Sequence, residues 1–214
     1  MTEAIRKLKK TAAALEEADQ AVAEATLPIR HERIVELLGG LSEIGDQPQM
    51  RTLAAGLIGA GLFTRDRRLA RAGARVVAAH ELATVAKNFV KRRVDRTRPR
   101  SLGDGEAPHI RRGRNEEKEE TSFPSGHSAG AAAAARAFVR EYPEQRAAAY
   151  AGAGLVALAQ VPRCAHYPSD VGAGLAIGIA LEAVSDWLLS GLLRPLPVPC
   201  VNASRESLYR HQEP

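Results

Sequence analysis

FPSGHSAGAAAAARAF, the stretch from Phe123 to Phe138, places a Pro-Ser-Gly-His turn directly in front of a run of alanines. Serine is a favoured helix N-cap, glycine eases the turn, and alanine has the highest helix propensity of all residues. The stretch therefore predicts a helix over residues 126–141 that begins at Ser125. The small side chains of such a helix allow neighbouring helices to pack closely against it.

The composition of the whole chain favours the same fold class. Of the 214 residues, 45% are hydrophobic and only 4% are aromatic, and the apolar positions are mainly alanine, leucine and glycine. A chain of this length can bury one sizeable core. The pattern of apolar residues predicts helices over residues 1–25, 28–39, 48–64, 66–96, 126–141, 144–161 and 168–193, and it indicates no strand.

We expect an all-α helical bundle of about five core helices with an N-terminal amphipathic helical extension. The predicted boundaries are residues 1–47 for the extension and residues 48–194 for the bundle domain. Residues 195–214 are expected to form an irregular C-terminal tail, because prolines follow one another at Pro195, Pro197 and Pro199.

The charge of the chain is concentrated in one segment. Between Lys91 and Arg100, the sequence KRRVDRTRPR holds six basic residues and one acid, whereas the formal net charge of the whole chain is +5. Such a cluster indicates an anionic partner, which can be a phosphate group, a nucleic acid or a lipid headgroup surface. The two cysteines, Cys164 and Cys200, have no metal-type spacing, so the sequence predicts neither a zinc site nor a disulfide framework.

The turn before the alanine run has two interpretations. Ser125 and Gly126 can simply cap and start a helix. The unpaired N–H groups and positive dipole end of a helix N-terminus also form a natural phosphate cradle. His127, whose ordinary pKa lies near neutrality, could then protonate a leaving group.

Two further clusters carry residue types that suit phosphate chemistry. Lys91 and Arg98 are seven residues apart, which on the expected helix 66–96 places both cations on the same side. His166 and Asp170 are four residues apart, and Pro168 between them suits the first position of a new helix. A carboxylate on one imidazole nitrogen fixes the tautomer and leaves the other nitrogen free to attack. Each cluster also has a structural interpretation, as a basic helix end or as a helix cap.

Taken together, the three clusters resemble the motifs of the type 2 phosphatidic acid phosphatases, a family that shares its core with bacterial acid phosphatases and vanadium haloperoxidases. The family's first motif, Lys, six residues, Arg-Pro, is matched by KRRVDRTRP. Its second, Pro-Ser-Gly-His, is matched at residues 124–127, and the second half of its third, His, three residues, Asp, by HYPSD at residues 166–170. One feature departs from the family: the arginine of the third motif falls on Gln160, and Arg163 stands three residues before His166 instead.

The resemblance implies a metal-independent phosphatase without a cofactor, acting on a phosphate monoester or a diphosphate. His166 would attack phosphorus, Asp170 would orient it, and His127 would protonate the departing oxygen. The phosphate contacts implied for this sequence are Lys91, Arg98, Ser125, Gly126 and Arg163. The implied substrate is a phosphorylated lipid or a small phosphoester.

The resemblance also raises the question of a membrane, because this family's helical core is often embedded in one. Five apolar stretches are present, but charges interrupt them, and none offers 18 uncharged residues in a row. Five arginines between residues 65 and 75 would face the cytoplasm by the positive-inside rule. The expected location is therefore a bacterial inner membrane, with the active site on the non-cytoplasmic face.

Several alternatives stay open at this point. The chain could be a soluble acid phosphatase, a haloperoxidase-like enzyme that acts on small substrates, or an inactive pseudo-phosphatase, because Gln160 replaces an arginine. A helical nucleic-acid-binding protein would explain the basic cluster, but it would leave the Pro-Ser-Gly-His and HYPSD segments without a role. We therefore expect a lipid or small-molecule partner and no nucleic acid.

Overall fold

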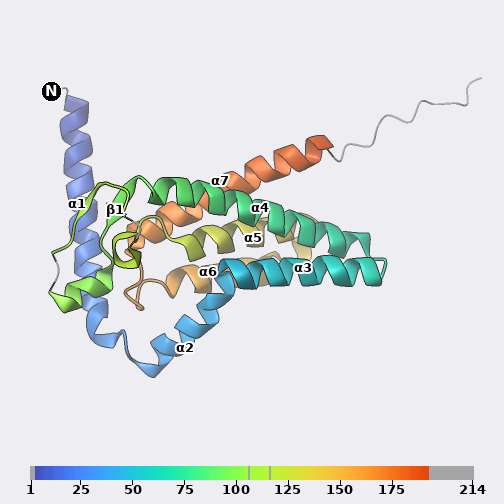
Figure 1. Ribbon diagram of the computed structural model, residues 1–214, viewed down its shortest axis with the longest axis horizontal. Helices are drawn as coiled ribbons and strands as arrows, with labels where there is room; N and C mark the ends of the chain where they lie inside the picture. The colour runs from blue at the N-terminus through green and yellow to red at the C-terminus, as the bar shows by residue number, and fades with distance from the viewer. Residues whose placement is uncertain (1–2, 106, 116, 193–214) are drawn as a thin grey trace, which may run out of the picture.

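The structure is a computed structural model that describes residues 3–105, 107–115 and 117–192. Five helices lie side by side as an elongated bundle (Figure 1) and make extensive mutual contacts. They are α3 (Gln47–Phe63), α4 (Arg67–Lys91), α5 (Gly126–Glu141), α6 (Arg146–Leu158) and α7 (Pro168–Leu192). The expected all-α bundle with about five core helices is thereby confirmed. The tail predicted over residues 195–214, together with Cys200, lies outside the described residues.

Two further helices and several short elements gather at one end of the bundle. Helix α1 (Glu3–Thr26) runs across this end, and α2 (Arg33–Ser42) leads from it towards α3 (Figure 1). The short 3-10 helices are η1 (Leu27–Ile29), η2 (Glu43–Gly45), η3 (Pro99–Asp104), η4 (Lys118–Glu120) and η5 (Pro143–Gln145). All of them except η5 belong to the segments at this end, which also holds the ends of the helices that carry the motif residues.

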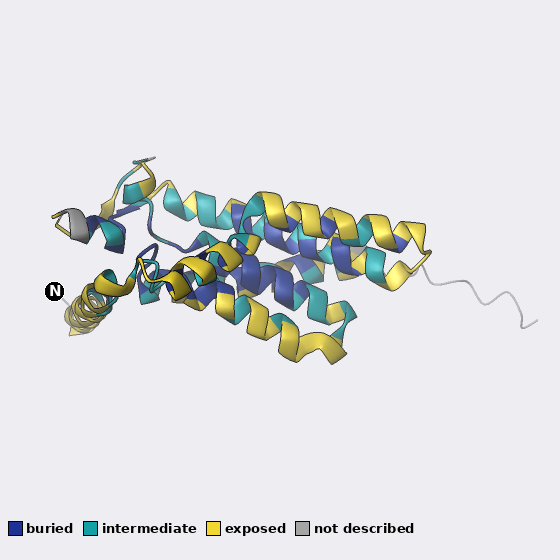
Figure 2. Cartoon of the chain, turned by 90° about the horizontal axis from the view of Figure 1, so that it is seen from below, coloured by how far each residue is buried: buried dark blue, intermediate teal, exposed yellow. Residues whose placement is uncertain are grey.

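Helix α5 is the centre of the bundle because its small side chains let its neighbours come close. It packs against α4, α6 and α7, and nine of its residues are buried, most of them alanines. Two glycines of α7 make the closest approach possible. A Cβ atom added at Gly174 or Gly178 would collide with the carbonyl oxygen of Ser125 or Ala129, respectively. Figure 2 shows the resulting band of buried residues along the inside of the bundle.

One of the charges that interrupt the apolar stretches is buried and paired. Glu182 of α7 is only 1% exposed, and it accepts hydrogen bonds from Arg136 and Arg140 of α5, both at 2.9 Å. Buried charges are tolerated when they are paired in this way. Among the described residues, α7 from Pro168 to Gly191 is the helix that is long and apolar enough to cross a membrane.

Two of the expected helix boundaries are wrong. The helix expected over 66–96 ends at Lys91, and the chain continues as strand β1 (Val94–Arg96), which pairs antiparallel with β2 (Ile110–Arg112). A short two-stranded sheet is therefore present where no strand was expected. The prediction carried the helix too far because the pairing of residues 94–96 with residues 110–112 is not visible in the local pattern, and Pro99 itself restricts only Arg98.

The second boundary error concerns the helix expected over 28–39. This helix begins only at Arg33 and continues through Gly39 and Gly40 to Ser42. The two glycines were interpreted as a stop, but Gly39 has a packing role instead. A Cβ atom at Gly39 would lie 2.9 Å from Nε of Arg163, so the absence of a side chain makes room for the arginine.

Candidate active site

His166 and Asp170 meet where a loop enters helix α7. Pro168 is the first residue of α7, so Asp170 lies in the first turn, as the sequence predicts. The Asp170 carboxylate accepts a hydrogen bond from the backbone N–H of Tyr167 at 2.9 Å, which caps the helix. The same carboxylate oxygen lies 3.7 Å from Nδ1 of His166. Asp170 therefore serves as a helix cap and as the neighbour of the imidazole at the same time.

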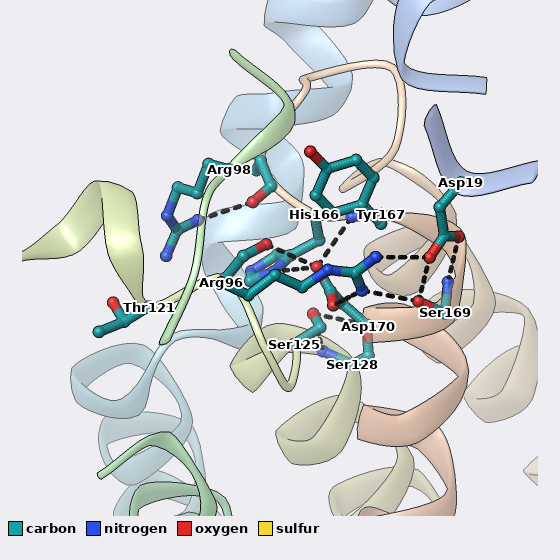
Figure 3. A network of polar contacts seen from close by, with 12 residues as sticks. Asp19, Arg96, Arg98, Thr121, Ser125, Ser128, His166, Tyr167, Ser169 and Asp170 are labelled. Atoms are coloured by element: carbon teal, nitrogen blue, oxygen red, sulfur yellow. Dashed lines mark hydrogen bonds and ion pairs between the residues drawn. The ribbon is translucent and has the colours of Figure 1, made fainter. Parts of the chain in front are cut away.

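The Asp170 carboxylate is held by donors from several segments. Ser122 donates from its hydroxyl group to Oδ2 at 2.5 Å, and Arg96 donates from Nη1 to Oδ1 at 2.6 Å. Asp170 is fully buried, and Ser122 also has no exposed surface. Because three groups fix its two oxygens, the carboxylate has a single orientation beside the imidazole (Figure 3).

Helix α1 completes this network through Asp19. Asp19 is 1% exposed and accepts a hydrogen bond from Nη2 of Arg96 at 2.7 Å, and it also accepts hydrogen bonds from the backbone N–H and the hydroxyl group of Ser169. Arg96 thus bridges two buried carboxylates, one on α1 and one on α7, and its guanidinium group lies over the Tyr167 ring (Figure 3). Removing one partner of such a buried network costs about 3–5 kcal/mol, because it leaves a buried charge without compensation.

His166 is buried among these charges and is 3% exposed. Burial lowers the pKa of His166 to about 4, and the positive charges of Arg98 and Lys91 act in the same direction, whereas Asp170 opposes them. The imidazole is therefore neutral at pH 7. A neutral imidazole has a free lone pair on one nitrogen, which is the form that a nucleophile requires.

Arg98 and Lys91 direct their positive groups to main-chain carbonyl oxygens near His166. Arg98 donates to the carbonyl oxygen of Ala165 at 2.8 Å and to that of Lys118 at 2.6 Å, and Lys91 donates to that of Thr121 at 2.6 Å. Burial is the main reason why the pKa of Arg98 is lowered to about 10. Lys91 ends α4 and Arg98 follows β1, so the two cations converge through a strand and a turn, and the expected shared helix face is wrong.

Ser125 and Gly126 open α5 next to this cluster. Ser125 is the N-cap, and its hydroxyl oxygen accepts from the hydroxyl group of Ser128 at 2.9 Å. Its backbone N–H donates to the carbonyl oxygen of Asp170 at 3.0 Å, which ties the starts of α5 and α7 together. A Cβ atom at Gly126 would lie 2.9 Å from Nζ of Lys87, so a further ammonium group lies at this helix N-terminus.

His127 faces the segment between α2 and α3. Its Nε2 atom lies 3.0 Å from Oδ1 of Asp46 and 4.0 Å from a carboxylate oxygen of Glu43. In the part of the chain that the structure describes, these three residues form the group that could hold a metal ion, with ligand atoms within 4.8 Å of one another. When the imidazole is protonated, the two carboxylates stabilise it as an ion pair.

Arg163 and Gln160 also face the η2 segment. Arg163 donates to Glu43 at 2.7 Å and to the hydroxyl oxygen of Ser42 at 2.8 Å. Gln160 is 1% exposed, and its amide donates to Ser42 at 3.1 Å and to the carbonyl oxygen of Val156 at 2.9 Å. The structure thus brings Lys91, Arg98, His166, Asp170 and the start of α5 together, and it places Arg163 on the η2 side with His127.

The sequence analysis missed four charged residues near the site, namely Asp19, Glu43, Asp46 and Arg96. Asp19 had a usable signal: it lies on the same face of α1 as Leu15 and Val22, and a charge on an apolar face needs a partner. Asp46 resembles an ordinary N-cap before Pro48, and Glu43 and Arg96 lie in charged surroundings. The sequence gives no signal for these three.

Comparisons with known proteins agree with this geometry. The sequence profile of the PAP2 superfamily matches residues 72–190, which is more than half of the chain. A lipid A 1-phosphatase of Rhizobium johnstonii is 40% identical over 95 residues, covering 42% of this chain and 37% of the relative. A lipid A 1-phosphatase of Rhizobium etli is 49% identical over 57 residues, covering 27% of this chain and 25% of the relative. The matches thus span well under half the length of either curated relative.

The fold has a counterpart among solved structures. It matches the crystal structure described as the first transmembrane PAP2-type phosphatidylglycerolphosphate phosphatase, from Bacillus subtilis, with a TM-score of 0.59 and 22% identity. The match covers 85% of this chain and 89% of the other, so the two proteins share a fold over most of their length.

Proposed function

Since the chain belongs to the PAP2 superfamily, we propose that it is a metal-independent phosphatase that hydrolyses a phosphate monoester or diphosphate of a lipid through a phosphohistidine intermediate. The observation that carries this proposal is the arrangement around His166. A neutral, buried imidazole lies beside a fixed carboxylate, the buried Arg98 and the half-buried Lys91, at the N-terminus of a helix.

In the first step, Nε2 of His166 attacks phosphorus, because Nδ1 lies on the side of Asp170. A nitrogen–phosphorus bond forms and the bond between phosphorus and the leaving oxygen breaks. His127 gives its proton to that oxygen. Asp170 stabilises the positive charge that the imidazole acquires, as a buried carboxylate does in other triads.

In the second step, water attacks the phosphohistidine and His127 accepts one proton from it. The nitrogen–phosphorus bond breaks, inorganic phosphate leaves, and His166 becomes neutral again. The ion pair of His127 with Asp46 stabilises the protonated imidazole that this step produces. One histidine thus serves as acid and then as base.

Arg98 and Lys91 bind the phosphate oxygens in this account, together with Ser125 and the N–H group of Gly126. In the structure, Arg98 and Lys91 donate to the main-chain carbonyl oxygens of Ala165 and Thr121. A phosphate oxygen carries negative charge that a carbonyl oxygen lacks, so the two cations can exchange these carbonyl contacts for contacts with phosphate. The remaining catalysis is positioning and charge stabilisation, as phosphoryl transfer generally requires.

A lipid substrate is supported by an apolar cavity of about 510 Å³ between α3, α5 and α6. Ile44 and Val156 line the cavity at its end near the site. A Cβ atom at Gly45 would touch both Val156 and the His127 ring, so the cavity begins next to the proposed acid. An acyl chain could therefore lie in the bundle while its phosphate group reaches His166.

A membrane location is supported by large apolar side chains on the outside of the bundle. Phe63 is 91% exposed, Phe89 is 59% exposed and Trp187 is 73% exposed. Soluble monomeric proteins rarely expose extended apolar patches. Arg65 and Arg67 are exposed at the turn between α3 and α4, which lies at the end of α4 opposite to Lys91. The positive-inside rule, applied to this turn, would place it in the cytoplasm of a bacterial cell and the proposed active site on the other face of the inner membrane, whereas the arginines that follow Lys91 at the other end of α4 favour the opposite orientation.

The proposed function is tested by phosphate release from purified protein in detergent, with a chelator present throughout. The substrates to compare are lipid A carrying a 1-phosphate, phosphatidylglycerolphosphate and a water-soluble phosphoester. The relatives' names indicate the first two substrates. We expect release from a lipid substrate that the chelator does not reduce. Activity that is lost with chelator and restored by a divalent ion would contradict the mechanism.

The Asp19–Arg96–Asp170 network leads to a prediction about positioning. We expect Asp19→Asn to lower kcat by about 10²-fold, because an error of ~1 Å at a reacting group can cost that much. The amide keeps the size of the carboxylate but loses the charge that holds Arg96. Kinetics of Asp19→Asn and of the matched control Glu17→Gln, an exposed position on the same helix, test this. Parental kcat in folded Asp19→Asn protein would show that α1 has no part in positioning Asp170.

We expect loss of Arg163 to affect catalysis and loss of Gln160 to affect stability. We expect Arg163→Ala to lower kcat/KM by about 10–100-fold, since a charge-assisted hydrogen bond is worth roughly 1.5–3 kcal/mol. Gln160→Ala should instead lower the thermal midpoint of unfolding with little change in kcat/KM, because among the described residues the buried amide donates to Ser42 and Val156 and to no other group. Kinetics and thermal unfolding of both variants distinguish the two roles. A normal kcat/KM for Arg163→Ala would show that Arg163 does not bind the phosphate group.

A further inference from the structure

A hollow lined by four arginines lies on the small sheet, outside the proposed active site. Its volume is about 540 Å³, and its lining consists of Arg92, Arg93, Val94, Arg112, Gly113 and Arg114. These residues come from the end of α4 with β1 and from β2 with the turn that follows it. None of the proposed catalytic or phosphate-binding residues lines this hollow.

The backbone around the hollow is fixed by strand pairing. Val94 pairs with Arg112, and the N–H group of Gly113 donates to the carbonyl oxygen of Arg93 at 3.3 Å. Asp95 accepts a hydrogen bond from the N–H group of Asn115 at 2.9 Å. Its carboxylate also occupies the space that a Cβ atom at position 113 would need, so only glycine fits there. The four arginines are therefore carried by an ordered hairpin.

The positive charge of the hollow is not neutralised by the carboxylates that the structure describes. Arg111, the neighbour outside the hollow, lies 3.7 Å from Asp95 and 3.9 Å from Glu120. Arg96 and Arg100, in the same segment, form close ion pairs. Arg92, Arg93, Arg112 and Arg114 have no such pair among the described residues. Guanidinium groups that line one hollow attract phosphate, which they can bind with paired hydrogen bonds.

The position of the hollow indicates the source of that phosphate. Val85 and Phe89 are 65% and 59% exposed and lie one turn apart on α4. The guanidinium group of Arg93 lies 3.5 Å from the centre of the Phe89 ring and donates to the Phe89 carbonyl oxygen at 2.8 Å. Two exposed apolar side chains thus lie on the last turns of α4, directly before the arginines. An aromatic ring beside cations at a helix end is typical of the headgroup level of a membrane.

We propose that the arginine hollow binds the phosphate groups of anionic membrane lipids, as a headgroup site separate from the site of hydrolysis. An anionic lipid would place its acyl chains along Val85 and Phe89 and its phosphate among the arginines. Each basic residue near an anionic membrane surface contributes about 1 kcal/mol, which is roughly fivefold in affinity. The site would hold the catalytic end of the bundle at the headgroup level of anionic membranes.

The test measures lipid retention and needs no turnover, so its failure is distinct from a failure of the proposed hydrolysis. Protein is purified from micelles that contain equal amounts of phosphatidylglycerol and phosphatidylcholine, and the retained lipids are counted by native mass spectrometry. We expect the parental protein to retain phosphatidylglycerol preferentially. In the triple variant Arg92→Gln, Arg112→Gln, Arg114→Gln, the ratio of retained phosphatidylglycerol to phosphatidylcholine should fall at least about tenfold. Arg93 stays unchanged because it packs on Phe89.

The matched control removes three arginines elsewhere, by Arg65→Gln, Arg67→Gln and Arg146→Gln, at exposed positions away from the hollow. This variant should lose clearly less of the preference, because none of its three arginines lines the hollow. An unchanged preference in the first triple variant, or an equal loss in both, would overturn the proposal. Displacement of the retained lipid by millimolar inorganic phosphate would also contradict it, because the hollow would then be a site for the free anion.

Discussion

His166→Ala should abolish turnover, with a loss of roughly 10⁶-fold in kcat, the scale reported for removal of a nucleophile in a well-studied protease. In the proposed mechanism the nitrogen–phosphorus bond cannot form without this imidazole. Because the side chain is only 3% exposed, its removal also leaves a cavity. Thermal unfolding must therefore accompany the kinetics, so that the loss is measured on folded protein.

Two comparisons make this result specific. His31→Ala removes an exposed histidine of the N-terminal region and should leave kcat unchanged. His166→Asn keeps a polar side chain of similar size and should be as inactive as the alanine variant. If His166→Asn or His166→Ala retained more than about one hundredth of the parental kcat, a route without this nucleophile would operate and the assignment would be wrong.

His127→Ala should lower kcat by about 10²–10⁴-fold, the usual contribution of a positioned general acid. The loss should depend on the leaving group. With a substrate whose leaving oxygen needs no proton, such as a nitrophenyl phosphate, the release of nitrophenol in the first turnover should be much closer to the parental rate, whereas steady-state hydrolysis stays slow because water attack lacks its base. This pattern follows because the first step then no longer needs a proton from the imidazole.

Asp46 provides the control for that assignment, since its carboxylate lies 3.0 Å from the same imidazole nitrogen. Asp46→Asn should reduce kcat less than His127→Ala does, because it removes only the ion pair that stabilises the charged imidazole. If the first turnover of His127→Ala slowed equally with lipid and nitrophenyl substrates, proton donation would be ruled out and His127 would have a role in binding only.

Much of the fold follows from the sequence because its signals are local. The alanine run at residues 129–135 and the Pro-Ser-Gly-His turn specify α5, and Pro168 marks the start of α7. The boundaries of α5 and α7 agree with the prediction within a residue. Helix α4 ends early for a non-local reason, since the strand that replaces its last turn pairs with residues 110–112, far along the chain.

The same distinction applies to the candidate site. The motif residues were visible because each cluster is contiguous in sequence. The network around Asp170 was not, because Asp19 lies 77 residues before Arg96, which it contacts. In the sequence, the charges within the apolar stretches argue against membrane spans. In the structure, Glu182 of α7 accepts hydrogen bonds from Arg136 and Arg140 of α5, so these charges compensate one another. Contacts between residues that are far apart in the sequence become visible only in the three-dimensional structure, so the sequence alone does not predict these pairs.

These contacts also bear on the expected division into an N-terminal segment over residues 1–47 and a bundle domain over 48–194. Helix α1 supplies Asp19 to the network at Asp170, and Glu43 holds Arg163. We infer that the N-terminal segment and the bundle work as one unit. Deletion of the first 47 residues should therefore reduce activity as well as stability.

The phosphohistidine itself is the most direct test of the account. The protein is mixed with a lipid substrate carrying a radioactive phosphate, quenched in alkali within the first turnover, and digested. The account predicts one labelled peptide containing His166, with a label that is stable in alkali and lost in acid. The label should be absent from His166→Ala and should accumulate in His127→Ala when the substrate carries a nitrophenyl leaving group, because water attack then lacks its base. Turnover without any labelled enzyme, or a label on a residue other than His166, would contradict the mechanism.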